Sequence, residues 1–556
     1  MLMDTAGRLS QLRSKMDQQG ISACVLTPTD EFGAEIPAES NRWIKHFSGF
    51  SESMGCLVVT DSEVALFCAP MFVEQAKKEV GEGVEVFSYN DERIADWLAE
   101  RGIQKLGYNS KTTSRFFKSY ILQGLEEVCL DDGFFDDLWP DRPPPVISQA
   151  YVYPLEYAGQ TWQQKLEAMR KRIDRDETIL VTSPHTVNWL FNIRGSDYPF
   201  DPVCKCYAVV TKTGKPKLYI DENSLTSQVR MHFGDEVETL PLAEIYNFNL
   251  NETVLFDRHT CPQALYIHFS DCAERDYITL NMRMRKNSTE LECIRRAVER
   301  NSNYIYAFMQ WIERHKGTLD EVTAINSLHE YLKSDPSFLS LAYPIICGVD
   351  ENGAGLHYSA TPATNKNLKG GELLVLDVHC HYKFGSTDVT RTIALKPELV
   401  PLDLRLEYTF VLKGLIDFCL AEFQAGTQVS SLDNLARSPI KVLGLDYAHL
   451  TCHTVGSCTN LHESPQDFAL HKGMVLGVEP ACYPNNKYGI RLENMVEVVS
   501  NGKGQLKFET LTKIPFDRNL ILEHMLSPQQ KQWLKDYNEQ LPKHIQGAGL
   551  LPSSNR

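Results

Sequence analysis

The sequence predicts an α/β (α+β) chain in which two related N-terminal α/β domains precede a larger C-terminal domain. With 556 residues, the chain exceeds the ~250–300 residues at which single cores stop growing, so several domains are expected. A helix-and-strand pattern occurs twice, a proline-rich run lies between the copies, and a long amphipathic pattern begins at Ser288. The predicted domains are 1–157, 158–284 and 285–556.

The first two domains are predicted from an imperfect duplication. Residues 8–25 read as a helix followed by a strand, and residues 165–181 repeat this pattern. Each copy continues with an Asn-x-Trp-like segment, a loop of small residues and a strand that ends in Val-Val-Thr. Ordinary α/β alternation is the alternative. Neither copy contains a phosphate-binding glycine loop, which indicates scaffold and substrate-access domains.

Two changes in pattern mark the predicted boundaries. The run Trp-Pro-Asp-Arg-Pro-Pro-Pro at 139–145 cannot continue a helix or a central strand. Further on, Ser288 begins an amphipathic helix, and Thr289 with Glu292 is predicted to form its capping box.

Composition excludes several classes of protein. The formal charge of −16 and the pI of about 5.5 argue against nucleic acid and anionic membranes as partners. We find no secretory signal pattern and no apolar run of the ~18 residues that a membrane span requires. The 15 cysteines are scattered, as expected for reduced thiols in a cytoplasmic protein.

The third domain is predicted to contain a hairpin that carries two aspartates. Residues 372–378 are strongly apolar and β-prone, residues 383–386 form the turn, and residues 388–394 form the second strand. Asp377 and Asp388 lie almost symmetrically about the tip, so they are expected to be near neighbours and to repel each other unless a cation lies between them. The alternative is that each is a surface or turn aspartate.

A second predicted hairpin carries two glutamates. Residues 474–480 and 490–496 read as strands, with a turn at 484–487. Glu479 ends the first strand and Glu493 lies in the second. Alone, either residue would more often be salt-bridged or at a sheet edge.

Three histidines, His449, His453 and His462, fall between these hairpins. Single histidines are more often structural, and the inner glutamate of the zincin motif is absent. One imidazole beside four carboxylates nevertheless suits Mn²⁺, Zn²⁺, Co²⁺ or Fe²⁺ in a two-metal hydrolase centre. The predicted ligands are Asp377, Asp388, His453, Glu479 and Glu493.

Over essentially its whole length the sequence resembles the metal-dependent creatinase, prolidase and aminopeptidase P superfamily, which has the pita-bread fold. The resemblance is greatest to the three-domain, eukaryotic cytosolic Xaa-Pro aminopeptidases. It rests on several motifs in order, at 189–197, 356–358, 387–392, 453–457, 460–463, 479–480 and 489–494.

The resemblance implies a role for each candidate residue. Asp377 would bind one metal, Asp388 and Glu493 would bridge both, and His453 with Glu479 would complete the second site. His357 and His462 resemble the histidines that contact the substrate carbonyl and stabilise the tetrahedral intermediate. His449 resembles a third active-site histidine.

The resemblance also implies the reaction. A hydroxide that bridges two divalent metals, usually manganese with zinc or cobalt as alternatives, would attack the carbonyl before proline. The expected substrates are peptides with a free amino terminus and a penultimate proline. A homodimer is implied by the resemblance alone.

The sequence departs from the family in two places. An Asp-Gly-Arg-Tyr stretch is common in the first domain, but residues 69–72 are Ala-Pro-Met-Phe, so an arginine contact to substrate is expected to be lost. Near the metals, where small glycines are usual, the chain has His379, Cys452 and Thr454. Two alternatives therefore stay open: a dinuclear C–N hydrolase or dipeptidase with altered specificity, and a non-catalytic binding protein.

Overall fold

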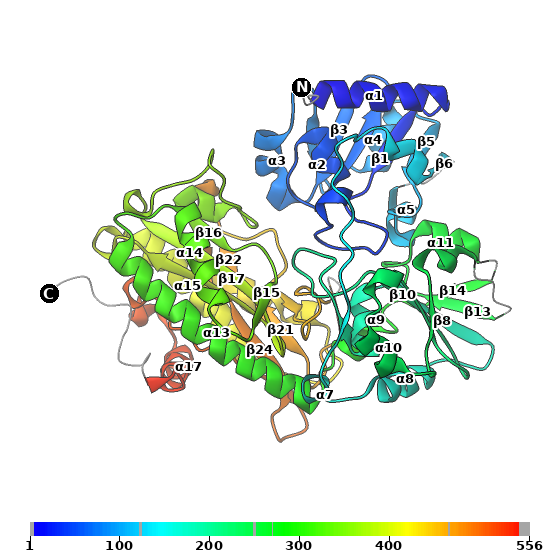
Figure 1. Cartoon of the computed structure of the whole chain (residues 1–556). Helices are drawn as coiled ribbons and strands as arrows, with labels where there is room; N and C mark the ends of the chain where they lie inside the picture. Colours follow the sequence, from blue (N-terminus) through cyan, green and yellow to red (C-terminus); the bar gives the residue numbers. More distant parts are fainter. Residues whose placement is uncertain (1–4, 122–124, 248–251, 270, 465–466, 544–556) are drawn as a thin grey trace. The chain divides into compact units, whose positions relative to one another are not determined.

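The computed structural model describes residues 5–121, 125–247, 252–269, 271–464 and 467–543 (Figure 1). The chain divides into two compact units. Unit 1 comprises Met1–Pro154 and Gln160–Thr279, and unit 2 comprises Leu155–Gly159 and Leu280–Arg556. The ends of the first and third predicted domains, 1–4 and 544–556, lie outside the described residues. Within the described part of the chain, no helix combines the length and apolarity needed to span a bilayer.

The first sheet of unit 1 has the strand order β4-β3-β2-β1-β5-β6. Its central strands β1 to β3 are apolar and buried along their whole length, as expected for a sheet covered on both faces. The elements are β1 Ala23–Leu26, β2 Gly55–Thr60, β3 Val64–Cys68, β4 Glu85–Ser88, β5 Lys105–Asn109 and β6 Glu126–Leu130, with helices α1 Thr5–Gln18, α2 Trp43–Ser48, α3 Val73–Glu79, α4 Ile94–Glu100, α5 Arg115–Ile121 and α6 Asp132–Asp136.

The second sheet of unit 1, β12-β11-β10-β8-β13-β14, has the same order and the same strand directions. The predicted helix-and-strand repeat is confirmed by α1 with β1 and by α8 with β8. The elements are β8 Glu177–Val181, β10 Cys206–Thr211, β11 Lys217–Ile220, β12 Glu238–Leu240, β13 Thr253–Phe256 and β14 Cys272–Glu274, with α8 Trp162–Arg170, α9 Pro184–Phe191, α10 Ser227–Phe233 and α11 Gln263–His268; β7 Tyr151–Val152 pairs separately with β9 Ile193–Arg194.

Unit 2 contains the predicted aspartate hairpin, formed by β17 Leu373–Tyr382 and β18 Gly385–Ala394. Both strands are buried throughout, and β15 Phe338–Leu341 and β16 Ile346–Val349 pair with the other edge of β17. Asp388 lies opposite His379, whereas Asp377 lies opposite Thr390. The two aspartates are therefore diagonal neighbours on the ladder.

The predicted glutamate hairpin is confirmed, and its ladder is interrupted once. Strand β21 Val475–Val478 pairs with β24 Asn494–Ser500, whereas β22 Ala481–Cys482 pairs with β23 Ile490–Arg491. Glu479 and Glu493 lie in the interruption, because the Glu479 N–H donates to Thr451 O, just before β20, and the Glu493 N–H donates to Thr390 O on β18. The remaining strands of this sheet are β20 Cys452–Thr454, β25 Leu506–Thr510 and β19 Glu422–Phe423.

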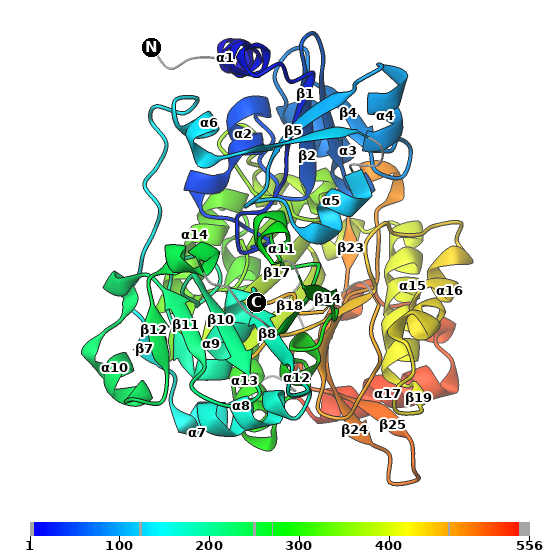
Figure 2. The same cartoon turned by 90° about the vertical axis from the view of Figure 1, so that its right-hand side faces the viewer.

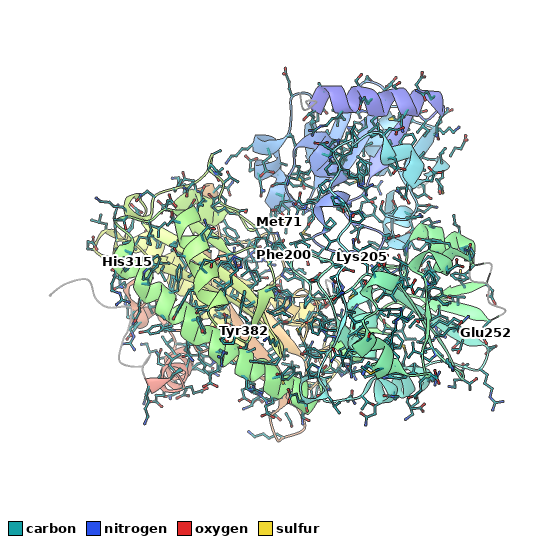
Figure 3. All side chains as sticks on the ribbon, in the orientation of Figure 1. Met71, Phe200, Lys205, Glu252, His315 and Tyr382 are labelled. Carbon is teal, nitrogen blue, oxygen red and sulfur yellow. The ribbon has the colours of Figure 1, made fainter. Side chains whose placement is uncertain are left out.

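Helices complete unit 2. Helix α13 runs beside the aspartate hairpin (Figure 1), and the hydroxyl of Tyr382, labelled in Figure 3, donates to Asn301 of this helix at 3.3 Å. Helices α15 and α16 lie side by side (Figure 2). The helices are α7 Leu155–Ala158, α12 Leu280–Arg283, α13 Ser288–His315, α14 Glu321–Lys333, α15 Leu402–Cys419, α16 Asp433–Lys441 and α17 Pro528–Glu539.

The predicted start of α13 at Ser288 is confirmed, but the predicted capping box is wrong. Asn287 and Glu290 form the box, in place of Thr289 and Glu292. Asn287 has the extended backbone of an N-cap, and its side chain accepts from the N–H groups of the first turn.

Candidate metal centre

A cavity of about 40 Å³ lies within unit 2. The predicted ligands all line it, and so do two of the three predicted catalytic histidines, His357 and His462. His449 is not among the lining residues. The lining residues are Tyr343, Ile346, Leu356, His357, Asp377, His379, Asp388, His453, His462, Glu479 and Glu493.

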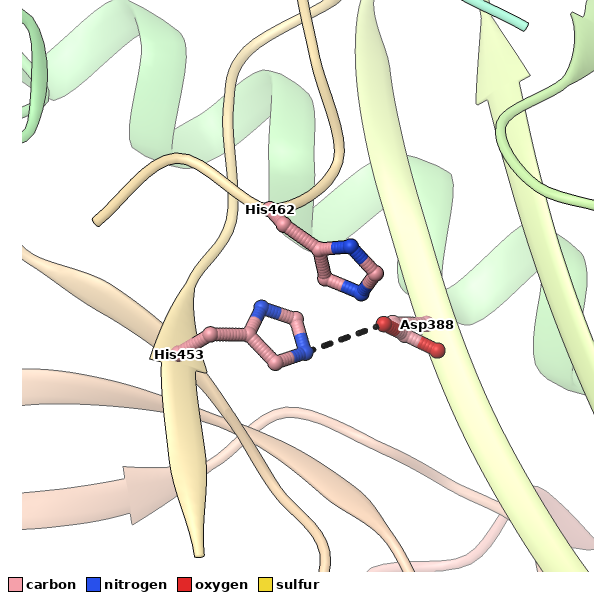
Figure 4. Close-up of side chains that lie close together, drawn as sticks. All are labelled: Asp388, His453 and His462. Carbon is pink, nitrogen blue, oxygen red and sulfur yellow. Dashed lines mark ion pairs between the residues drawn. The ribbon is translucent and has the colours of Figure 1, made fainter. Parts of the chain in front are cut away.

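Strands of two sheets bring the donors together. Asp377 and Asp388 come from β17 and β18, His453 from β20, and the two glutamates from the interruption beside β21 and β24. Nε2 of His453 lies 3.4 Å from Asp388 Oδ2 (Figure 4). The same nitrogen lies 3.9 Å from one oxygen of each glutamate. The hydroxyl of Thr390 on β18 donates to Glu493 Oε2 at 3.1 Å, which joins the sheets at the cavity.

Apart from the two glutamates, the donors of the cavity form two groups that share Asp388. One group is Asp377, His379 and Asp388, and the other is Asp388, His453 and His462; within each group the donor atoms lie within 4.8 Å of one another. A shared carboxylate between two sets of oxygen and nitrogen donors suits a pair of divalent ions.

Three carboxylate oxygens support this fit. Asp377 Oδ1, Asp388 Oδ1 and Glu493 Oε1 are buried, and none accepts a hydrogen bond from the residues that the structure describes. Buried carboxylate oxygens without a donor are costly, and a bound cation would compensate them. The residues present therefore fit the metal pair.

The electrostatics of the cavity lead to the same conclusion. Burial, together with Asp388 and Asp377, raises the pKa of Glu493 well above its usual range. Burial also raises the pKa of Glu479. Burial opposes ionisation of Asp377 as well, but His379 and Arg491 more than offset it and lower the pKa of this carboxyl. Divalent ions would favour the ionised form of all these groups.

His449 is connected to the cavity indirectly. Arg491 donates to Asp377 Oδ2 at 2.8 Å and to the Tyr483 hydroxyl at 3.1 Å, and that hydroxyl lies 3.0 Å from His449 Nε2. Burial and Arg491 lower the pKa of His449 to about 3. In the neutral ring, Nδ1–H donates to Leu450 O at 2.9 Å, so Nε2 accepts from Tyr483.

Sequence reasoning missed Tyr343 and Arg491. The Tyr343 hydroxyl lies 2.9 Å from His357 Nδ1, and its ring centre lies 5.4 Å from that of His462. Arg491 carried a usable signal, since it lies in the 489–494 motif two residues before Glu493. Tyr343 carried none, because no local pattern connects it with His357, its hydrogen-bond partner 14 residues later.

Three residues near the proposed metals, His379, Cys452 and Thr454, depart from the family pattern. Of these three, only His379 lines the cavity. Side chains alternate along a strand, so Cys452 and Thr454 point away from the side taken by His453 on β20. Cys452 belongs instead to a buried apolar cluster. The departure at 69–72 lies in unit 1, where Pro70–Phe72 forms a 3-10 turn after β3.

Comparisons with protein families cover most of the chain. The model for metallopeptidase family M24 matches residues 292–500, and that for the C-terminal region of peptidase M24 matches 504–548. Two models of the creatinase/prolidase N-terminal domain match residues 8–132 and 141–290.

Individual relatives match over almost the full length. The chain is 29% identical to a probable Xaa-Pro aminopeptidase P from Pyrenophora teres f. teres, over 97% of this chain and 89% of the relative. A probable Xaa-Pro aminopeptidase P from Aspergillus fumigatus is also 29% identical, with the same coverage. Among solved structures, X-prolyl aminopeptidase from Caenorhabditis elegans, described as a cytosolic enzyme with a di-nuclear active site, has a TM-score of 0.92 and 26% identity, over 97% of this chain and 95% of that one.

Proposed function

Because the chain belongs to metallopeptidase family M24, with N-terminal domains of the creatinase/prolidase type, we propose that it is a metal-dependent Xaa-Pro aminopeptidase. It releases the first residue of peptides whose second residue is proline. The proposal rests on one observation: seven predicted site residues meet at one cavity in a chain that matches a di-nuclear X-prolyl aminopeptidase over 97% of its length.

Two divalent metal ions are the cofactors of this activity. We assign Asp377 to one ion, His453 and Glu479 to the other, and Asp388 and Glu493 to both. Manganese is the proposed metal, with zinc and cobalt as alternatives, because four of the five donors are carboxylates. When bound, such a pair supplies Lewis acidity and a hydroxide nucleophile at neutral pH.

The histidines of the cavity act on the substrate. We assign His357 and His462 to the carbonyl oxygen before proline, where they stabilise the negative charge that develops. Tyr343 holds the His357 ring through Nδ1. His453 and His462 pack edge to face at 4.5 Å, which orients the second ring. His449 has a positioning role, through Tyr483 and Arg491.

Selectivity for proline follows from the bond that is cleaved. The tertiary amide before proline has no N–H, so recognition depends on the shape of the ring and on the free amino terminus. We also propose a cytoplasmic homodimer, with domain boundaries near residues 157 and 284. The similarity to a relative described as cytosolic supports the location.

The second candidate function is a dipeptidase or another dinuclear C–N hydrolase. It is favoured by the Ala-Pro-Met-Phe sequence at 69–72, where an arginine is usual. A non-catalytic binding protein is disfavoured, because all five predicted ligands are present.

Hydrolysis of two tripeptides tests the proposal. Purified protein loaded with Mn²⁺ is incubated with Arg-Pro-Pro or Arg-Ala-Ala, beside a Glu479→Ala control, and free arginine is measured. We expect release from Arg-Pro-Pro alone, and loss of release in the control. Cleavage of the dipeptide Arg-Pro without cleavage of Arg-Pro-Pro would favour the dipeptidase. No release from protein that contains two metals would overturn the aminopeptidase assignment.

A further inference from the structure

His379 occupies the space between the two aspartates of the metal centre. It lies on β17 two residues after Asp377, so both side chains point to the same face of the sheet. The register of the hairpin places it directly opposite Asp388. Its side chain is only 6% exposed, so the ring is buried within the site.

The distances around this ring are those between ligands of one ion. Nε2 lies 2.9 Å from Asp377 Oδ1 and 3.4 Å from Asp388 Oδ1. For metal–ligand bonds of ~2.1 Å, ligands at 90° lie ~3.0 Å apart and ligands at the tetrahedral angle ~3.4 Å apart. Both measured distances agree with these values.

Nε2 lies at ion-pair distance from both aspartates, although neither contact has the geometry of a regular hydrogen bond. Asp377 Oδ1 and Asp388 Oδ1 accept no hydrogen bond from the described residues, although Nε2 is close to both. The other ring nitrogen, Nδ1, is buried and likewise has no hydrogen-bond partner in the described part of the chain. Two carboxylate oxygens and one ring nitrogen thus surround one point, and all three atoms lie within 4.8 Å of one another.

We propose that His379 is a protein ligand of the metal ion held by Asp377 and Asp388. The inference rests on the proposed two-metal centre and adds a second imidazole to it, in a position where the family usually has a small residue. Nitrogen donors favour Zn²⁺ and Co²⁺ over Mn²⁺. His379 therefore shifts the preference of this metal site from Mn²⁺ toward Zn²⁺ and Co²⁺.

Metal binding by the full chain tests the proposal without reference to activity. Metal-free wild type, His379→Gly and His379→Leu are titrated with Co²⁺, followed by calorimetry and visible absorption. The leucine variant keeps a buried side chain without a donor, in case the glycine variant folds poorly. His381→Gly is the matched control, since His381 is buried on the same strand and its Nδ1 lies 2.8 Å from Ser386 Oγ.

We expect wild type and the control to bind two Co²⁺ ions, and both His379 variants to bind one of the two at least tenfold more weakly, with an altered absorption spectrum. X-ray absorption of the zinc-loaded proteins should show about one imidazole per zinc in wild type and about half as many in the His379 variants. In competition, the variants should prefer Mn²⁺ more than wild type does.

Two results would overturn the inference. The first is two ions bound by the His379 variants with unchanged affinity and spectrum. The second is one ion bound by wild type and two by His379→Gly, which would mean that the ring excludes a metal. Wild type that binds two ions through His379 but does not cleave Arg-Pro-Pro would instead contradict the proposed activity and leave this inference intact.

Discussion

Gly477 leaves the space in which the donors of the second ion lie. A Cβ at this position would come within 2.5 Å of Glu493 Oε1 and 2.9 Å of His453 Nε2. We expect Gly477→Ala to displace both donors and to lower metal affinity and kcat at least tenfold, because ligand placement tolerates little error. Metal content and Arg-Pro-Pro hydrolysis measure the effect. Gly370→Ala is the control, since its Cβ would meet nothing within 4 Å; equal activity of the two variants would contradict the prediction.

Glu31 makes the stability of unit 1 depend on pH. It lines a cavity of about 360 Å³, where burial and Asp30 raise the pKa of its carboxyl to about 7. A carboxyl whose pKa rises on folding binds more protons in the folded state, so the free energy of unfolding falls as pH rises from 4.5 to about 7.

We expect Glu31→Gln to be more stable than wild type at pH 8 by roughly 2 kcal/mol, allowing for partial exposure of the side chain, and to match wild type at pH 4.5. Urea denaturation followed by tryptophan fluorescence measures both. The exposed Glu82→Gln serves as the control. A stabilisation that is the same at both pH values would show that proton uptake by Glu31 is not its cause.

For single residues, the sequence predicted which side chains line the cavity. It did not predict the contacts that hold those side chains in place. The five ligands were recognisable because each lies in a segment that reads as buried structure. The contact from Arg491 to Asp377 spans 114 residues, and that from Tyr343 to His357 depends on the path of a loop. Neither follows from local pattern. The sequence marked His379 as a departure beside Asp377, and the register of β17 and β18 places it opposite Asp388.

Among the elements, the segment before α13 is fixed to the loop that follows His462 by a buried ion pair. Lys286 Nζ contacts Glu463, and neither side chain is exposed. Arg283 lies 3.5 Å from the same carboxylate. This pair joins residues 177 positions apart, next to a residue of the cavity.

We expect Lys286→Met to lower the free energy of unfolding by about 3 kcal/mol, because it leaves Glu463 ionised and buried with Arg283 as its remaining cation. It should also lower kcat by displacing His462. Thermal unfolding and peptide hydrolysis measure the two effects. The double variant Lys286→Met with Glu463→Gln should recover part of the stability. The control is Lys333→Met, which removes an exposed ion pair and should change the free energy of unfolding by less than about 1 kcal/mol. A loss of stability in Lys333→Met as large as that in Lys286→Met would show that burial of the pair is not the cause.

The elements themselves were largely predictable. The duplicated helix and strand, the aspartate hairpin and the start of α13 all follow from periodicity. The glutamate hairpin was also predictable, but the interruption of its ladder was not, because it is set by hydrogen bonds to β18 and to Thr451, which lie outside the hairpin. The capping box was misplaced by two residues, since Asn287 competed with Thr289 for the same role.

For the whole molecule, the proposed metals belong to unit 2 alone. Unit 1 also has an acidic cluster, Asp257, His259 and Asp276, but the Asp257 oxygens accept from backbone N–H groups and Asp276 pairs with Arg258. We expect chelation to lower the unfolding temperature of unit 2 by roughly 10 °C and to leave that of unit 1 unchanged, because ligand release destabilises only the unit that binds. Scanning calorimetry with and without chelator measures this. Asp388→Asn should unfold at the lower temperature under both conditions, and a shift in unit 1 would indicate a metal there.

The two units of this protein cannot be separated by a single cut in the chain. Leu155–Gly159 belongs to unit 2, although unit 1 precedes and follows it, so the polypeptide passes between the units three times. Ala158 O accepts a hydrogen bond from the side chain of Asn287, the cap of α13. A chain that began at residue 285 would leave this segment behind and uncover the first turn of its longest helix. The catalytic unit is thus compact in space but discontinuous in sequence. Its separate expression would require residues 155–159 as a second polypeptide, or a circular permutation that joins them to the rest of the unit.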